Sequence, residues 1–154
     1  MYNTRFKEVS YKKSILKPYY SAKESAPEQE FIKLLENSKK VKWWFKNGEA
    51  DKKYFAVKYD DEKGFERGFY IDFIIFTEDG RIGIFDTKSG ITAKVAKEKA
   101  EALAKYIKEQ NQKYKKKLWG GIALFKDGSC RYNDSEEYSF DEHHLGTEWK
   151  FLNI

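Results

Sequence analysis

Two apolar stretches, FYIDFIIF (69–76) and RIGIFDTK (81–88), decide the fold of this 154-residue chain. Both are rich in aromatic and β-branched residues, and the turn residues between them predict a β-hairpin. Apolar residues occupy both faces of each stretch, which is typical of central strands that are covered on both sides. Each stretch nevertheless contains an aspartate, Asp72 or Asp86. Because burying an unpaired carboxylate costs several kcal/mol, both aspartates need a structural or functional reason.

The loop between the two strands predicts which face each aspartate occupies. A three-residue loop from Glu78 to Gly80, with Gly80 in the left-handed conformation, is a favoured hairpin connection. In the register that this loop sets, Asp72 lies directly opposite Asp86. Lys88 shares the face of Asp86, because side chains alternate along a strand with a period of two. A two-residue loop would instead place the aspartates on opposite faces, so the candidate site depends on the register.

Further elements are expected on both sides of this hairpin. Ser25, Pro27 and Glu28 form an N-terminal helix signal ahead of an apolar arc that ends near Ser38. The remaining pattern predicts a helix over 93–110, strands over 41–45, 54–59 and 118–125, and weaker strands at 130–132 and 149–154. Helices alternate with strands in this order, so an α/β fold is expected.

The length predicts one domain, and its parts differ in charge. Residues 25–125 form the expected core. Residues 1–24 are basic and are interpreted as an N-terminal arm or as the remnant of a preceding domain. Residues 126–154 form an acidic C-terminal extension, expected to pack on the core. The aromatic fraction of 18% argues against disorder, although 36% of the residues are charged.

Cysteine and histidine are scarce, which excludes several classes of site. Cys130 is the only cysteine, so a disulfide scaffold and a Cys-cluster zinc site are excluded. With His143 and His144 as the only histidines, a His-based metal centre or a Ser-His-Asp triad is nearly excluded. No apolar run approaches the length of a membrane-spanning helix, and the N-terminus lacks a signal-peptide pattern. We therefore expect a cytoplasmic protein that does not enter a membrane.

The paired aspartates suit a hard divalent cation. Mg²⁺ takes one or two protein carboxylates and completes its shell with water and phosphate oxygens. Lys88 beside them can hold the attacking water or offset charge that develops in the transition state. Glu28 falls within the apolar arc of its helix and is a candidate third carboxylate, although it can also complete a capping box with Ser25. The plainer alternatives are a solvated Asp72 and a structural ion pair between Asp86 and Lys88.

The net charge of +5 is unevenly distributed, since two basic blocks, 1–24 and 92–117, flank a mixed central part. A basic stripe can be the electrostatic footprint of a nucleic-acid interface. The second block contains candidate DNA contacts, with a solvated helix face as the alternative: Lys94, Lys97, Lys99 and Lys105.

This arrangement resembles the PD-(D/E)xK nuclease superfamily. The matching segments are FYID (69–72), FDTKSG (85–90) and the lysine-rich KVAKEKAEALAKYI (94–107), with Ile71 where the superfamily name has proline. More narrowly, the chain is similar to the nuclease domain at the C-terminal end of type III restriction enzymes and related DEAD/DEAH-box helicase subunits. The segment PEQEFIKLLENSKKVKWWFKNG (27–48) resembles the one that opens that domain.

The resemblance implies a restriction-endonuclease-like core, a mixed β-sheet flanked by helices in the order αβββαβ. It also implies a Mg²⁺-dependent DNA endonuclease, with Mn²⁺ able to substitute, in which Glu28, Asp72 and Asp86 hold the metal and Lys88 is the catalytic lysine. DNA is the expected partner, with a helicase motor domain and a methyltransferase subunit as possible associates. The alternatives are a catalytically inactive nuclease-fold module for DNA binding or assembly, and a metal-free scaffold with its carboxylates in ordinary ion pairs.

Overall fold

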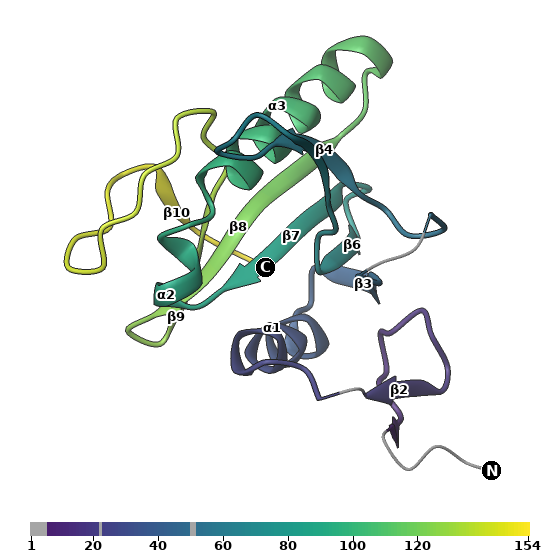
Figure 1. The fold of residues 1–154 in the computed structure, drawn as a ribbon. Coiled ribbons are helices and arrows are strands. Elements are labelled where there is room, and N and C mark those ends of the chain that lie inside the picture. Colours follow the sequence, from purple (N-terminus) through teal and green to yellow (C-terminus); the bar gives the residue numbers. More distant parts are fainter. Residues whose placement is uncertain (1–5, 22, 50–51) are drawn as a thin grey trace.

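The computed structural model describes residues 6–21, 23–49 and 52–154. In this part of the chain, a six-stranded mixed sheet has the strand order β10-β9-β8-β7-β6-β3. Helices lie against both of its faces, so the predicted α/β fold with a mixed sheet flanked by helices is confirmed (Figure 1). The sheet strands are β3 (Val41–Lys46), β6 (Phe73–Thr77), β7 (Ile82–Lys88), β8 (Leu118–Lys126), β9 (Ser129–Asn133) and β10 (Trp149–Phe151).

The other elements surround this sheet. The helices are α1 (Ala26–Asn37), the short α2 (Gly90–Ala93) and α3 (Lys97–Tyr114). Two small hairpins are formed by β1 (Lys7–Val9) with β2 (Tyr19–Ser21), and by β4 (Val57–Asp60) with β5 (Glu66–Phe69). The chain therefore inserts one hairpin, β4–β5, between β3 and β6.

The β6–β7 hairpin has the predicted register. Ile74 pairs with Ile84, and the loop closes through a hydrogen bond from the Thr77 backbone N–H to the Arg81 carbonyl. Gly80 has a φ of 83°, the left-handed conformation that the three-residue loop requires. The last ladder pair is Phe73 with Phe85, so the next residues along this register are Asp72 and Asp86.

The two faces of the sheet carry separate apolar clusters. On one face, Phe31 of α1 packs 4.9 Å from Phe73 and 5.6 Å from Phe85, measured between ring centroids. On the other face, Leu103 of α3 is buried in a cluster with Ile84. Neighbouring residues of β7 thus face opposite helices, as expected for a strand that is covered on both sides.

Three elements differ from the sequence prediction, and the strand expected over 54–59 is one of them, because β4 begins only at Val57. FYIDFIIF is not one strand, because β5 ends at Phe69 and β6 begins only at Phe73. The helix expected over 93–110 is preceded by a separate short turn of helix, α2, and begins at Lys97. Ser89 caps α2 and exchanges capping contacts with Thr92, so Thr92 lies inside that turn and does not cap the long helix.

Both ends of the described chain join the fold. In the basic arm, Trp44 of β3 exchanges backbone hydrogen bonds with Lys13 and Ile15, and Tyr19 is buried against its ring. Residues 1–5 and 22 of the arm lie outside the described residues. At the other end, β9 and β10 extend the sheet beyond β8, which agrees with the two weaker strand signals. Among the described residues, no helix is long and apolar enough to cross a membrane.

Candidate active site

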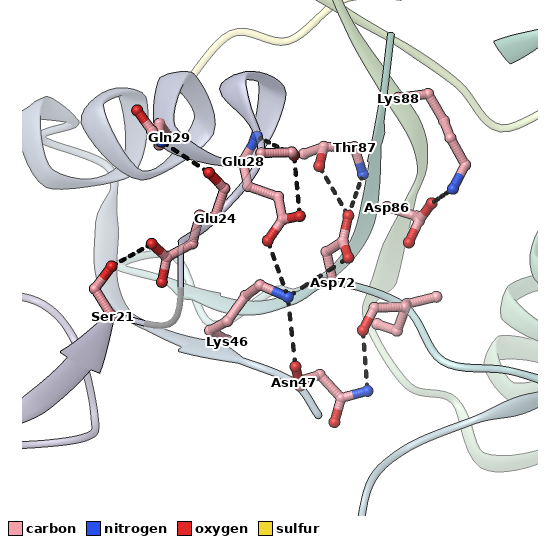
Figure 2. Close-up of polar contacts among 12 residues, drawn as sticks. Ser21, Glu24, Glu28, Gln29, Lys46, Asn47, Asp72, Asp86, Thr87 and Lys88 are labelled. Carbon is pink, nitrogen blue, oxygen red and sulfur yellow. Dashed lines mark hydrogen bonds and ion pairs between the residues drawn. The ribbon is translucent and has the colours of Figure 1, made fainter. Parts of the chain in front are cut away.

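The candidate site lies where β6 and β7 separate. Asp72 stands just before β6, and its Oδ2 accepts hydrogen bonds from the backbone N–H and the hydroxyl of Thr87, each at 2.8 Å (Figure 2). The carboxylate thus receives a backbone N–H of β7 just beyond the end of the β6–β7 ladder. This explains the break in FYIDFIIF, since the side chain of Asp72 replaces a strand residue as the partner of β7.

Asp86 is the most deeply buried charged group of the site. Its side chain is 2% exposed, and its Oδ2 lies 2.6 Å from the ammonium of Lys88. This contact is an ion pair, and Oδ2 makes no hydrogen bond of good geometry. Burial raises the pKa of Asp86 to about 7, and the nearby charge of Asp72 adds to the shift, while Lys88 and Lys99 oppose it. The effect of Asp72 on this pKa is consistent with two neighbouring carboxylates.

Glu28 reaches the site from the first turn of α1. Its Oε1 accepts from the Ser25 hydroxyl at 3.0 Å, and its backbone N–H donates to the same Ser25 oxygen at 3.3 Å. Its Oε2 lies 3.2 Å from the ammonium of Lys46. Glu28 therefore takes part in the helix cap and also faces the site, so its two predicted roles are compatible.

Lys46 is a site residue that the sequence reasoning missed. Its ammonium lies between two carboxylates, 3.2 Å from Glu28 Oε2 and 3.5 Å from Asp72 Oδ1 (Figure 2). Burial opposes the charge of Lys46, but Asp72 and Glu28 outweigh burial and raise the pKa of its ammonium. The signal that would have found it is the antiparallel pairing of β3 with β6, which sets Lys46 opposite Phe73, the neighbour of Asp72.

A cavity of about 210 Å³ gives access to these groups. Glu28, Asp72 and Lys88 line it, together with polar side chains at the starts of α1 and α2: Ser25, Ser89 and Thr92. The structure thus brings Glu28, Asp72 and Lys88 to one cavity. Asp86 does not line this cavity but forms an ion pair with Lys88, which does.

A divalent cation needs oxygen ligands in a suitable arrangement. Among residues 6–21, 23–49 and 52–154, no group of three Asp, Glu, His or Cys side chains is arranged to hold a metal ion. A pair of carboxylates is nevertheless sufficient protein ligation for Mg²⁺. Asp72 and Asp86 supply such a pair, because Asp86 Oδ2 makes no hydrogen bond of good geometry beyond its ion pair with Lys88, and the charge of Asp72 helps to raise the pKa of Asp86. Glu28 is not counted in this pair, because its carboxylate is already in an ion pair with Lys46.

The four candidate DNA-binding lysines fall into two groups. Three of them form exposed ion pairs: Lys94 with Glu142 at 3.3 Å, Lys97 with Glu101 at 3.0 Å and Lys105 with Glu109 at 3.9 Å. Exposed pairs of this kind contribute little to stability and are screened by salt. Lys99 differs, because its ammonium lies 5.5 Å from the ring centroid of Phe69 and acts on the pKa of Asp86. Of the four lysines, Lys99 is therefore the one whose charge acts on the carboxylate of Asp86.

Comparison with known proteins gave one match. The search of curated proteins and the search of solved structures each found no match. In the scan of protein families, the model of the YagJ family matches residues 14–142. This range takes in every site residue described above, from Glu28 to Lys105. Since the match spans well over half of the chain, the protein belongs to the YagJ family.

Proposed function

We propose that this protein is a Mg²⁺-dependent DNA endonuclease that hydrolyses phosphodiester bonds. The observation that carries the proposal is the buried carboxylate of Asp86, which is paired with Lys88 and feels the charge of the half-buried Asp72. A fold maximises its stability by keeping such groups apart, so a carboxylate that is 2% exposed beside another is typical of a functional site.

The order of the elements supports a restriction-endonuclease-like core. Without the β4–β5 hairpin and α2, the chain follows the order α1, β3, β6, β7, α3, β8. The strands β3, β6 and β7 pair antiparallel, and β8 pairs parallel to β7. This is the αβββαβ order that the resemblance to PD-(D/E)xK nucleases implies, and the D-x-K residues fall at the end of its third strand.

The residues of the site have complementary roles in this reaction. Asp72 and Asp86 would hold Mg²⁺ at the end of the hairpin. The bound ion would polarise the scissile phosphate and lower the pKa of a water molecule. Lys88 lines the cavity and carries its charge beside Asp86, where it can stabilise negative charge on the phosphate in the transition state. Lys46, which is itself paired with Glu28, would hold Asp72 in place.

DNA is the proposed substrate, and the basic residues 94–105 would supply phosphate contacts that do not depend on sequence. The resemblance to restriction and helicase subunits suggests work in a restriction or helicase-associated system in the cytoplasm. In such a system a helicase motor and a methyltransferase subunit are the proposed associates.

Nicking of supercoiled plasmid under single-turnover conditions tests the proposal. We expect cleavage with Mg²⁺ or Mn²⁺, none with EDTA, and a loss of about 100-fold or more in Lys88→Ala, the range for removing one group that stabilises developing charge. DNA affinity should change little, because one lysine is a small part of the basic surface. Lys58→Ala is the matched control, since Lys58 is exposed on β4 outside the cavity. Equal rates in the wild type and Lys88→Ala would refute the proposed mechanism, and cleavage of RNA alone would refute the substrate.

A metal-free assembly module is the second candidate. The observation that favours it is that each carboxylate has a lysine partner, with Lys46 on Glu28 and Asp72 and Lys88 on Asp86. Thermal unfolding separates the two candidates. The nuclease proposal predicts that Mn²⁺ raises the melting temperature of the wild type much more than that of Asp86→Ala. An equal response in both proteins would favour the assembly module.

A further inference from the structure

The ammonium of Lys46 lies in the acidic part of the site with little freedom to move. Its side chain is 12% exposed, and those of Glu28 and Asp72 are each 16% exposed. The backbone beneath it is fixed on both sides. Lys46 pairs with Phe73 in the sheet, and the next residue, Asn47, donates its backbone N–H to the Asp72 carbonyl at 2.8 Å. The ammonium also lies 5.5 Å from the ring centroid of Phe73.

The contacts of Asp72 leave it little capacity for further ligands. An ionised carboxylate offers about four lone-pair positions. Two positions on Oδ2 accept from Thr87, and Oδ1 faces Lys46. Asp72 can therefore give a metal roughly one further contact. That is enough to share one ion with Asp86 and too little to bridge two ions.

A second divalent ion would have to lie between Glu28 and Asp72, where the ammonium already is. The two like charges would repel strongly at such a separation in a half-buried site. Mg²⁺ in addition demands near-ideal octahedral geometry, which the fixed lysine chain would obstruct.

We propose that Lys46 is a built-in cation that takes the place of a second metal ion, so that the site binds a single divalent ion through Asp72 and Asp86. This inference rests on the proposed function and adds a positioning residue to it. Lys46 holds Glu28 and Asp72 together by its charge, and Lys88 remains the cation beside Asp86.

The experiment is a count of bound Mn²⁺ by electron paramagnetic resonance and calorimetry on the full chain. We expect one ion per chain in the wild type and two in Lys46→Gln, with the first ion bound on the order of tenfold more tightly once the repulsion is removed. Lys46→Arg keeps the charge and should bind one ion. Lys42→Gln is the matched control, because Lys42 is an exposed lysine of the same strand, and it should also bind one.

The outcomes separate this inference from the proposed function. Two ions in the wild type, or one ion in a folded Lys46→Gln, would overturn the role of Lys46 and leave the nuclease proposal standing. No ion in the wild type would overturn both. If Lys46→Gln does not fold, Lys46→Met, which removes the same charge from a side chain of similar length, takes its place in the count.

Discussion

Asp86 is held in an environment that disfavours its charge. Its carboxyl is 2% exposed, Asp72 lies nearby, and the favourable charges that face it come from Lys88 and Lys99. Burial therefore raises the pKa of Asp86 to about 7, well above its usual range. At pH values between the pKa of Asp86 in the unfolded protein and its pKa in the folded protein, Asp86 binds more protons in the folded state.

From this shift follows a pH dependence of stability. In EDTA, the contribution of Asp86 to the free energy of unfolding should rise as the pH falls from about 7 to about 4, because protonation relieves the buried charge. The contribution of Asp86 over this window is about 2–4 kcal/mol. Asp86→Asn should lose this slope and be more stable than the wild type at pH 8. Urea titrations across the pH range measure both effects, and parallel curves for the two proteins would contradict the burial argument.

At the scale of single residues, the sequence predicted the carboxylates of the site but missed Lys46, one of the two lysines that form ion pairs with them. Asp72 and Asp86 could be placed together because the turn residues Glu78 to Gly80 fix the register locally. Glu28 could be placed by its position on the helix. Lys46 could not, because its approach to Asp72 depends on the pairing of β3 with β6, and nothing in a short strand specifies its partner.

At the scale of elements, the prediction was wrong where tertiary hydrogen bonds compete with local pattern. FYIDFIIF has the composition of one continuous strand. The chain breaks at 70–72 because the buried side chain of Asn47 donates to the Ile71 carbonyl and Asp72 accepts from Thr87. These partners lie far away in the sequence. The helix boundary at Lys97 also escaped prediction, since Ser89 and Thr92 cap a separate turn.

The parallel pairing of β7 with β8 depends on Gly120. It has a φ of 136°, and a Cβ there would lie 2.0 Å from the Ile84 carbonyl oxygen. Gly120→Ala should therefore separate the two strands and lower the free energy of unfolding by about 3 kcal/mol, the upper end of the usual range for overpacking.

Gly128→Ala provides the matched control for this substitution. Gly128 has a φ of 75°, and nothing lies within 4 Å of its Cβ position. Only the backbone cost of about 1–2 kcal/mol should appear there. Chemical unfolding of both variants gives the comparison, and equal losses would show that crowding against β7 is unimportant.

At the scale of the whole molecule, the basic surface predicts how binding responds to salt. The affinity for duplex DNA should fall steeply as salt rises, because phosphate contacts release counterions. A variant with Lys94, Lys97, Lys99 and Lys105 changed to Gln should bind more weakly and show a smaller salt slope.

The control is a second variant with the same change of net charge, whose substitutions lie outside residues 94–105. In it, four other lysines are changed to Gln: Lys33, Lys58, Lys126 and Lys150. Affinity should be measured by fluorescence anisotropy at several salt concentrations. Equal losses in both variants would indicate that net charge alone matters, and binding without salt dependence would remove DNA as the substrate.

The anchoring of the arm on Trp44 has a consequence for solubility. β3 is one of the two edge strands of the sheet, and an uncovered edge strand is a template on which another chain can add. Lys13 and Ile15 occupy the backbone groups of Trp44 that such a chain would use. A variant that begins at residue 17 should therefore self-associate through β3 as its concentration rises, which light scattering would detect. The basic arm would then protect the protein against aggregation, and this role does not depend on the function of the site around Lys46.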